Sequence, residues 1–512
     1  MPTALISVYD KTGIVPLAEF LVQQGWTLLA TGGTLQALKA RALPAIEVST
    51  FTDFPECFDG RVKTLHPKIH GGLLFDRKKK SHTDDTRRLN IEAIDLAVVN
   101  LYPFENTIQK PGVGFEEAIE QIDIGGSSMI RSAAKNHASV TILTKPSQYE
   151  PFIRAVKEKR WGDVERRQCA IDAFDHTAHY DRAIADWMAQ SNTNSSTTLP
   201  KSLNLYLIQH QGLRYGENPH QAGAYYQEIS ADSCGLAKVK QLQGKELSFN
   251  NLLDIEACGR LVESFHEPAC VIVKHNNPCG VSLGSDIDSA FDRALACDSV
   301  SSFGGIVAFN QPVTESLARK MAETFWEVIM APNFSTEAKE IFESKKQLRL
   351  IEIDLPWSSL KNRDIRSVSG GFLVQSMDRH EVLVAKWDVK VQGSGSRPSD
   401  RDLYLAQTVV KSVKSNAIVL VQDGQTVGIG AGQMSRVEAV RIACDKAGSR
   451  AQGSILGSDA FFPFPDGLEL AASKGVRAFI HPGGSLRDPE VIASAQNLGV
   501  WLFATGIRHF RH

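Results

Sequence analysis

Residues Thr3–Thr34 read TALISVYDKTGIVPLAEFLVQQGWTLLATGGT, and the order of residue types in this stretch predicts the architecture of the first half of the chain. The apolar run at its start predicts a strand, Thr12–Gln24 predicts a helix, and Thr27–Ala30 predicts a second strand that ends at a Gly-Gly turn. Later apolar runs at Ile94–Tyr102 and Ser139–Thr144 predict further buried strands. Because strands alternate with helices, we expect a parallel, doubly wound sheet.

The second half is also mixed α/β. Strands are predicted over Ala269–His275, Gly305–Phe309 and Arg477–Gly484, and the DGQT turn within Ala417–Gly430 predicts a β-hairpin. No short tandem repeat is visible in this half.

The two halves are separated by a polar stretch, SNTNSSTTLPKS, from Ser191 to Ser202, which is typical of a linker or exposed loop. The charged, helix-forming residues of Ser147–Gln190 predict helices that connect the halves. We therefore expect one domain over residues 1–146, a helical connection and linker over 147–202, and a second domain over 203–512.

Composition excludes several classes of protein. The chain has 512 residues, 43% hydrophobic and 22% charged, which is ample for globular cores. Its 56 basic and 58 acidic residues nearly cancel, so we expect no global field that would hold nucleic acid or an anionic membrane. We expect neither a signal peptide nor a membrane span. The eight cysteines form no C-x-x-C pair, which favours free thiols in a reducing cytoplasm over a zinc site or disulfides.

Two motifs of the first half are suited to an anionic ligand. TGGT (Thr31–Thr34) follows a strand and precedes a helix, as a phosphate-binding turn does, although such turns are also common as plain connections. DGRVKTLHPKIHGG (Asp59–Gly72) gathers cations and histidines between glycines. A solvated charged loop is the alternative for this second motif.

Candidate proton-transfer groups follow in the first half. NLYPF places Tyr102 at the end of a buried strand, where ligands lie in open α/β sheets, although this ring could instead belong to the core. IDIGGSSMIRSAAKNH (Ile122–His137) supplies Asp123 and Lys135, which could move protons near a phosphate site. Asp123 could equally be an ordinary residue at a helix N-terminus.

In the second half, VKHNNPCG places Lys274 and His275 at the end of an apolar strand. A neutral histidine beside a cation offers a base paired with an electrostatic stabiliser, and a solvent-facing strand end is the alternative. Phe461 and Phe462, beside prolines, could form core or wall a slot for a flat heterocycle. The basic terminus RHFRH contains an aromatic residue, which favours a docked end over a frayed one.

Taken together and in order, these strings closely resemble the family of bifunctional AICAR transformylase / IMP cyclohydrolase enzymes of purine biosynthesis. The resemblance covers essentially the whole chain through SVYDKTG, TGGT, GRVKTLHPKIHGG, NLYPF, IDIGG, AAKNHASV, LRYGENPHQ, KELSFNN, KHNNPCG, SSFGG, KSNAIV, GIGAGQMSR, DAFFPFPDG and RHFRH.

The resemblance implies a methylglyoxal-synthase-like N-terminal domain and a C-terminal transformylase domain of two cytidine-deaminase-like subdomains. It implies formyl transfer from 10-formyltetrahydrofolate to AICAR, giving FAICAR, and then cyclodehydration of FAICAR to IMP. It also implies a cytoplasmic homodimer with transformylase sites at the interface, no catalytic metal, and room for a structural monovalent cation.

For cyclisation, the resemblance implies that Lys135, Asp123 and Tyr102 are catalytic. The implied nucleotide-binding residues of this site are Ser7, Asp10, Lys11, Thr31, Gly32, Gly33, Thr34, Arg61, Lys63, Thr64 and Asn100. Tyr9 departs from the family pattern, since many relatives carry Ser there, and a side-chain contact at this position would alter nucleotide affinity.

For formyl transfer, the resemblance implies His275 as base, Lys274 as stabiliser of charge at the formyl centre, and Asn416 as the residue that holds the reacting geometry. Substrate binding is implied for Arg214, Tyr215, Gly304, Glu327, Arg436, Phe461 and Arg508, and folate binding for Val437, Asp466, Ser485 and Leu486. Glu327 stands where some relatives carry Asp. An enzyme with one decayed site and a non-catalytic nucleotide sensor are the competing hypotheses, and the persistence of Lys135, Lys274 and His275 speaks against both.

Overall fold

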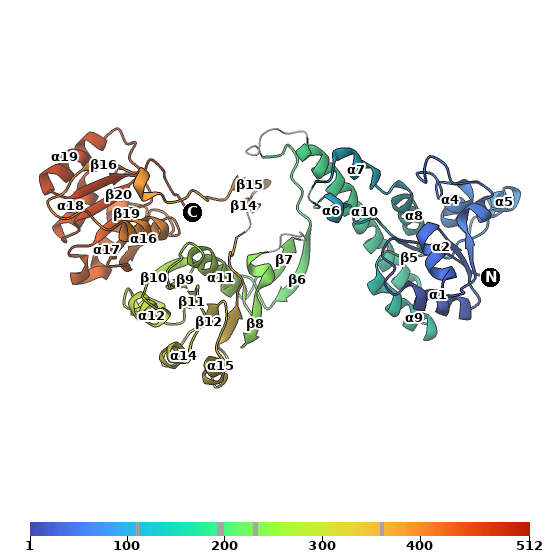
Figure 1. Ribbon diagram of the computed structural model, residues 1–512, viewed down its shortest axis with the longest axis horizontal. Coiled ribbons are helices and arrows are strands. Elements are labelled where there is room, and N and C mark those ends of the chain that lie inside the picture. The colour runs from blue at the N-terminus through green and yellow to red at the C-terminus, as the bar shows by residue number, and fades with distance from the viewer. Residues whose placement is uncertain (109, 111, 192–198, 229–233, 359–362) are drawn as a thin grey trace. The chain divides into compact units, whose positions relative to one another are not determined.

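The computed structural model describes the chain except residues 109, 111, 192–198, 229–233 and 359–362 (Figure 1). The chain forms two compact units, Met1–Asn204 and Leu205–His512. Of the predicted linker Ser191–Ser202, residues 192–198 lie outside the described part.

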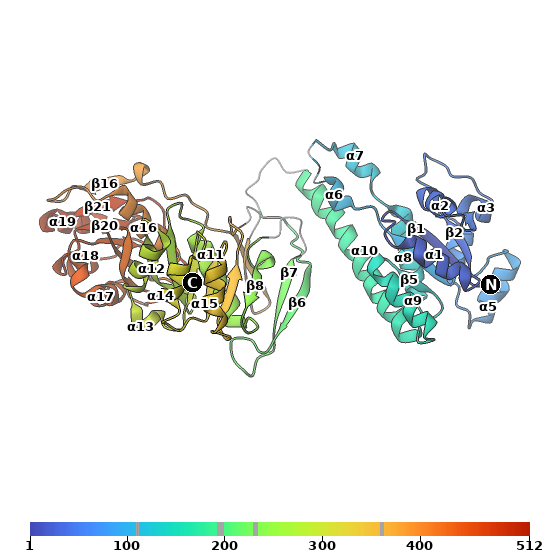
Figure 2. The same cartoon turned by 60° about the horizontal axis from the view of Figure 1, so that its bottom comes forward.

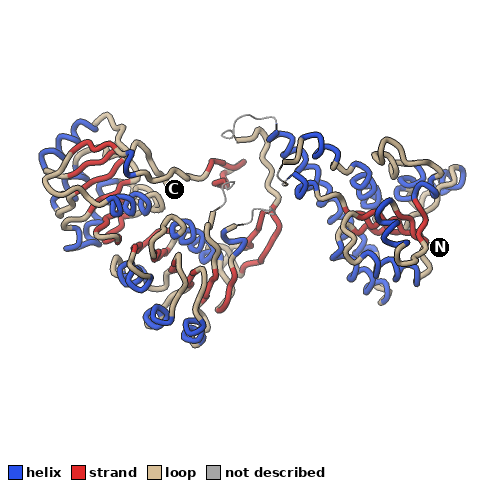
Figure 3. Tube along the Cα trace, viewed as in Figure 1, coloured by secondary structure: helices blue, strands red, loops and turns tan. Residues whose placement is uncertain are grey.

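The first unit is built on a parallel sheet with the strand order β3-β2-β1-β4-β5. Its strands are β1 (Thr3–Val8), β2 (Thr27–Ala30), β3 (Ala45–Glu47), β4 (Leu96–Asn100) and β5 (Thr141–Leu143). This order reverses direction beside β1, as in a doubly wound fold, so the predicted fold class of the first half is confirmed. Helices lie on both sides of these strands (Figure 3).

The helices of the first unit are α1 (Ile14–Gln23), α2 (Gly32–Lys39), α3 (Val48–Thr52), α4 (Pro67–Leu74), α5 (Lys80–Arg88), α6 (Phe104–Ile108), α7 (Phe115–Glu120), α8 (Ile124–Lys135), α9 (Tyr149–Lys157) and α10 (Asp163–Ser191), with the 3-10 turn η1 (Pro146–Gln148). The long helix α10 packs against α8 and β5 (Figure 2). Because helices cover both faces of the sheet, central-strand residues such as Leu5, Leu29 and Val98 are completely buried, and the strands are continuously apolar.

The second unit is built on a sheet with the strand order β16-β21-β20-β19-β17-β18-β10-β9-β11-β12-β13-β8. Its strands are β8 (Lys240–Gln243), β9 (Ala269–Lys274), β10 (Asn277–Leu283), β11 (Ile306–Phe309), β12 (Val328–Ala331), β13 (Arg349–Glu352), β16 (Asp388–Val391), β17 (Ile418–Gln422), β18 (Gln425–Gly430), β19 (Ile455–Ser458), β20 (Ala478–His481) and β21 (Trp501–Ala504). Two separate hairpins pair β6 (Leu207–Leu213) with β7 (Gly223–Glu228) and β14 (Arg363–Val368) with β15 (Gly371–Ser376).

The helices of the second unit are α11 (Phe249–Val262), α12 (Ile287–Leu295), α13 (Ser299–Ser302), α14 (Glu315–Met321), α15 (Thr336–Glu343), α16 (Asp400–Val410), α17 (Arg436–Ala447), α18 (Asp466–Ser473) and α19 (Asp488–Leu498), with the 3-10 turns η2 (Gly235–Lys238), η3 (Val384–Lys386) and η4 (Gly448–Ala451).

The large sheet contains the same arrangement twice. In the first half, β8 and α11 precede the β9–β10 hairpin, and the helix-linked strands β11, β12 and β13 follow it. In the second half, β16 and α16 precede the β17–β18 hairpin, and the helix-linked strands β19, β20 and β21 follow it. The strand order of one half is the mirror image of the strand order of the other. The halves meet where β10 and β18 pair antiparallel, at Ser282 and Gln425. The expected division into two related subdomains is therefore confirmed, although no tandem repeat is visible in the sequence.

The two central hairpins have matching turns. The turn residues are His275 and Asn276 between β9 and β10, and Asp423 and Gly424 between β17 and β18. The φ angles are 52° at His275, 64° at Asn276, 51° at Asp423 and 76° at Gly424. Positive φ angles at both turn positions are typical of the two-residue hairpin turn whose twist matches that of the flanking strands. The DGQT hairpin was predicted from the sequence, whereas the hairpin at His275 was not, because neither of its turn residues is glycine.

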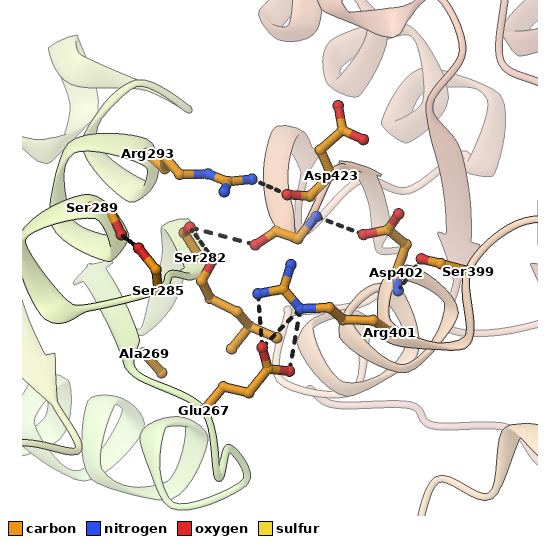
Figure 4. A network of polar contacts seen from close by, with 12 residues as sticks. Glu267, Ala269, Ser282, Ser285, Ser289, Arg293, Ser399, Arg401, Asp402 and Asp423 are labelled. Carbon is orange, nitrogen blue, oxygen red and sulfur yellow. Dashed lines mark hydrogen bonds and ion pairs between the residues drawn. The ribbon is translucent and has the colours of Figure 1, made fainter.

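A polar network joins the two subdomains at the edge of the sheet where β17 turns into β18 (Figure 4). Arg401 forms an ion pair with Glu267 at 2.8 Å. The Asp402 carboxylate accepts the N–H of Gly424 at 2.6 Å, and Arg293 donates to the carbonyl of Asp423. This edge therefore holds the halves together.

Candidate active sites

The first candidate site lies at the carboxyl edge of the parallel sheet. Asn100, the last residue of β4, accepts the N–H groups of Tyr9 at 2.6 Å and Asp10 at 3.0 Å on its side-chain oxygen. Its Nδ2 donates to the Asp10 carbonyl at 3.0 Å. The loop after β1 is thus fixed to the end of β4, at the edge where ligands bind in such sheets.

The TGGT turn adjoins this loop. Thr31 shares a hydroxyl–hydroxyl hydrogen bond of 2.9 Å with Ser7, and Thr34 Oγ1 accepts the N–H of Val8 at 3.0 Å. Helix α2 begins at Gly32, and no side chain caps its N-terminus. A Cβ added to Gly33 would lie 3.7 Å from Lys11 Nζ, so an ammonium group stands beside the turn. Free N–H groups with a nearby cation fit a phosphate.

Asp123 lies at the same edge of the sheet and caps α8 by accepting the N–H of Gly126 at 2.6 Å. Burial raises its pKa above the ordinary value, and the Lys63 ammonium group acts in the opposite direction, which places that lysine near the carboxyl group. A Cβ on Gly125 would lie 2.6 Å from Thr64 Oγ1. The cationic loop and the IDIGG turn therefore meet here, and Asp123 is both a helix cap and a partly desolvated carboxyl group.

Tyr102 belongs to this edge and not to the core, since it is 44% exposed. Its ring centroid lies 4.9 Å from that of Tyr9, which is also exposed. The position that departs from the family pattern thus contacts a predicted catalytic residue through its side chain. Arg61, also predicted, forms an exposed ion pair with Glu120.

Lys135 is not brought to this site. Asp123 precedes the first residue of α8 and Lys135 is its last, so about 18 Å of helix separates the two residues at 1.5 Å per residue. Lys135 is exposed near the start of β5, at the opposite edge of the sheet. Within one chain, Asp123 and Lys135 therefore lie at opposite ends of one helix, and the catalytic role of Lys135 stays a prediction.

The second candidate site follows one edge of the large sheet. Lys274 ends β9, whereas Gly304 precedes β11 and Glu327 precedes β12. Because β11 runs antiparallel to β9 and β12 runs parallel to β11, all three residues lie at the same edge of the sheet. Lys274 Nζ donates to the Phe303 carbonyl at 2.7 Å. Glu327 forms an ion pair of 2.7 Å with the buried Arg349. Four predicted residues, counting His275 in its turn, thus form a group in the first subdomain.

A pocket of about 520 Å³ lies at this edge in the second subdomain. Its lining is Asn416, Met434, Ser435, Arg436, Val437, Ala460, Phe461, Phe462, Pro463, Phe464, Asp466, Gly467, Arg508 and Phe510. Six of these were predicted as site residues: Asn416, Arg436, Val437, Phe461, Asp466 and Arg508. Phe462 is 1% exposed and belongs to the core as well, whereas Phe461 is 36% exposed. The core alternative therefore fits Phe462, and the alternative of a wall facing a ligand fits Phe461.

A buried ion pair fixes the floor of this pocket. Arg436 Nη1 donates to Asp459 at 2.6 Å, and these side chains are 6% and 0% exposed. Arg436 Nη2 donates to Asn416 Oδ1 at 2.8 Å, and Asn416 Nδ2 donates to the Gln433 carbonyl at 2.8 Å. The orientation of Asn416 is therefore set by Asp459 through Arg436. Sequence reasoning missed Asp459, because a buried aspartate inside an aromatic string gives no separate signal.

The C-terminal end is docked, as the sequence predicted. The N–H of His509 donates to the Asp459 carbonyl at 2.9 Å, and the N–H of Ser415 donates to the Arg511 carbonyl at 2.9 Å. Lys414 Nζ donates to the His512 carbonyl at 2.6 Å. The Arg508 guanidinium lies 4.4 Å from the Phe510 ring centroid at the pocket.

The two groups of the second unit are linked through the backbone. The N–H of Lys414 donates to Asn277 Oδ1 at 2.9 Å, which ties the segment of Asn416 to the hairpin of His275. Lys274 and His275 nevertheless do not line the pocket, and neither do Ser485 and Leu486, the latter fully exposed.

Arg214 and Tyr215 follow β6, outside the large sheet. The Arg214 guanidinium lies 5.5 Å from the Tyr215 ring centroid, and Asn250 donates to the Glu217 carbonyl at 3.3 Å, which ties this loop to the start of α11.

Among the described residues, no group of three or more His, Cys, Asp or Glu side chains could hold a metal ion. No helix in this part of the chain is long and apolar enough to span a membrane. None of the eight cysteines, all of which lie in the described residues, forms a disulfide.

Two family models match consecutive parts of the chain. The AICARFT/IMPCHase bienzyme family model matches residues 133–446, and the MGS-like domain model matches residues 13–128. The bifunctional purine biosynthesis protein PurH of Desulfitobacterium hafniense (strain DSM 10664 / DCB-2) is 47% identical over 525 residues, with 99% of each chain covered. PurH of Bacillus cereus (strain AH187) is 47% identical over 512 residues, again with 99% of each chain covered.

Among solved structures, the crystal structure of ForH is 29% identical and covers 38% of this chain and 100% of its own, with a TM-score of 0.35, which is too low for a comparison of folds. The relatives extend over both candidate sites and the bienzyme model matches more than half of the chain, and on these grounds the chain belongs to the AICARFT/IMPCHase bienzyme family.

Proposed function

We propose that this chain catalyses the last two steps of IMP biosynthesis, formyl transfer to AICAR and cyclodehydration of the FAICAR formed, at two separate sites. The observation that carries the proposal is the gathering of six predicted transformylase residues around one pocket of the second unit, while a different set gathers at the carboxyl edge of the first. Similarity to PurH over 99% of both chains supports the same conclusion.

In formyl transfer, the 5-amino nitrogen of AICAR attacks the formyl carbon of a formylated folate. This amine is conjugated and weakly nucleophilic, so a base that removes its proton during the attack lowers the barrier. His275 is that base, and the Lys274 ammonium group, held at the same strand end, stabilises the negative charge that develops on the formyl oxygen. Collapse of the tetrahedral intermediate expels the folate nitrogen, which takes up a proton, and leaves FAICAR.

The pocket of the second subdomain provides the binding groups. Phe461 offers an apolar face to a flat ring, and Arg508 offers a cation to a phosphate or carboxylate. Asn416, held by Arg436, presents a fixed amide to the carboxamide or formyl group. We propose 10-formyltetrahydrofolate as the donor, bound along Val437 and Asp466.

In cyclisation, the carboxamide nitrogen of FAICAR attacks its own formyl carbon, and water leaves to close the ring. The TGGT turn with Lys11 binds the phosphate, as a helix N-terminus beside a cation does. Asp123, whose pKa is raised by burial, and the nearby Lys63 are suited to moving the protons of this step, and Tyr102 faces the same edge. Lys135 lies at the other end of α8 in the same chain, and we keep its part in this step as a prediction.

We propose a homodimer in which transformylase sites combine groups from both subunits. The separation of Lys274 and His275 from the pocket that holds Asn416 and Arg508 supports this, since one chain then presents two incomplete halves. We propose the cytoplasm as its location, which fits eight cysteines without a disulfide. The predicted boundaries near residues 146 and 202 are kept as our proposal for the limits of the two catalytic domains.

The proposal is tested by assaying the purified chain for the two reactions separately. AICAR with 10-formyltetrahydrofolate should yield tetrahydrofolate, and preformed FAICAR without folate should yield IMP. Formation of IMP from FAICAR without any formyl transfer would identify an enzyme with one decayed site. Binding of AICAR and IMP without either reaction would identify a sensor.

A further inference from the structure

The turn that carries His275 has an unfavourable backbone conformation. His275 and Asn276 have φ angles of 52° and 64°, in the left-handed region that favours glycine. The equivalent turn of the second subdomain contains Gly424, which adopts such angles readily. The first turn therefore needs support from its surroundings to hold His275 in one place.

Asp254 provides this support from helix α11. Its Oδ1 accepts the N–H of Asn276 at 2.6 Å. Burial raises the pKa of Asp254, while hydrogen bonds from the N–H groups of Asn276 and His275 act in the opposite direction. A partly buried carboxylate with backbone donors of a strained turn as partners is a strong fixed contact.

The internal repeat provides a matched pair for this contact. In the second subdomain, Asp402 on helix α16 accepts the N–H of Gly424 at 2.6 Å, so each subdomain has one helical aspartate bound to the second residue of its central turn (Figure 4). The two turns lie at opposite edges of the sheet, because β10 and β18 pair antiparallel. The Asp402 turn is therefore remote from the edge that holds Lys274 and Asn416.

We propose that Asp254 is a positioning residue for formyl transfer, which fixes the His275–Asn276 turn and thereby aims the His275 imidazole at the reacting amine. Asp402 makes the same contact for a turn without a catalytic residue, so its contribution is to stability alone. This inference rests on the proposed formyl transfer. Absence of transfer in the unaltered chain would refute the proposed function, whereas the variants of Asp254 and Asp402 test only the positioning role of Asp254.

The experiment compares Asp254→Ala with Asp402→Ala in the full chain, with formyl transfer, cyclisation of preformed FAICAR and thermal unfolding measured for each. A catalytic group displaced by about 1 Å loses about 100-fold in rate. We expect Asp254→Ala to lower kcat of formyl transfer about 100-fold, with KM for AICAR changed less than about threefold, because binding groups lie elsewhere. Asp402→Ala should lower the unfolding temperature similarly and change kcat less than about threefold, because the contact that it removes is remote from the reacting atoms.

A second substitution tests the reason for the effect. Asn276→Gly introduces the residue type of the second turn, so Asp254→Ala combined with Asn276→Gly should recover about tenfold of the lost kcat, because glycine relieves the backbone strain. Cyclisation should remain unchanged in every variant. Equal losses of kcat in Asp254→Ala and Asp402→Ala, or no loss in the former, would overturn the proposal.

Should Asp254→Ala not fold, Asp254→Asn replaces it, because the amide keeps one oxygen acceptor and loses the charge. A kcat of formyl transfer lowered about tenfold, with normal cyclisation, would support the positioning role. An unchanged kcat would overturn it.

Discussion

Replacement of Asp459 by alanine should destabilise the second unit and disable formyl transfer while sparing cyclisation. Asp459 is completely buried and is the ion-pair partner of Arg436, whose side chain is 6% exposed. Its removal leaves a buried guanidinium without its counter-charge, which costs about 3–5 kcal/mol of folding free energy. Asp459 also accepts a hydrogen bond from Ser415, and its carbonyl accepts the N–H of His509.

The loss of activity follows from the same contacts. Arg436 holds Asn416 at 2.8 Å, so a released guanidinium also releases the amide at the pocket. A misplacement of about 1 Å costs about 100-fold in rate, and we expect a reduction of this order in kcat of formyl transfer. The first unit has a separate core, so cyclisation of FAICAR should be unchanged.

Denaturant unfolding and the two separate assays measure these effects. Asp459→Leu combined with Arg436→Met removes both charges, so it should recover most of the stability and none of the formyl transfer. A loss of less than about 1 kcal/mol in Asp459→Ala would refute the argument that the buried pair is tightly coupled. Full formyl-transfer activity in the double variant would refute the role of Arg436 in holding Asn416.

Two further predictions concern single side chains. Tyr9→Ser removes a ring that packs on Tyr102, and an aromatic pair contributes about 0.5–1.5 kcal/mol. KM for FAICAR should therefore rise about 2- to 10-fold, with formyl transfer unchanged. An unchanged KM would show that only the backbone of Tyr9 matters. Burial lowers the pKa of His481 to about 4, so its neutral form is favoured in the folded state and the unfolded chain binds the extra proton below about pH 6.5. The free energy of unfolding that the neutral imidazole contributes is fully present above pH 6.5 and should fall by about 3 kcal/mol as the pH drops toward 4. His481→Phe should reduce this dependence of the unfolding free energy on pH, measured by urea titration at several pH values. The same pH dependence in the variant and the unaltered chain would contradict the assignment.

The fold of the first unit was predictable because its strands are continuous apolar runs separated by helical patterns. A parallel sheet with both faces covered requires this composition, and the runs near Leu5, Leu29 and Val98 satisfy it. The duplication of the second unit was not visible as a repeat, because the two halves share arrangement and turn geometry without sharing their sequence strings.

Site residues were predictable where a chemical group lies beside a glycine or proline turn, as with Thr31 and Phe461. The residues that hold them were not: Asp254 is a partly buried and Asp459 a completely buried single aspartate, and their roles depend on contacts with residues distant in the sequence. The position of Lys135 relative to Asp123 was not visible in the sequence for a similar reason. A string such as IDIGGSSMIRSAAK keeps two ionisable residues close in sequence, but the helix places them at opposite ends.

Two separate sites on one chain are best distinguished by His275→Ala, assayed for formyl transfer to AICAR and for cyclisation of preformed FAICAR. The account predicts that formyl transfer falls by at least about 100-fold, as expected for loss of a general base, while cyclisation keeps its rate. Asp123→Asn should give the reverse pattern. Equal loss of both activities in folded His275→Ala would contradict the assignment of the two reactions to two sites.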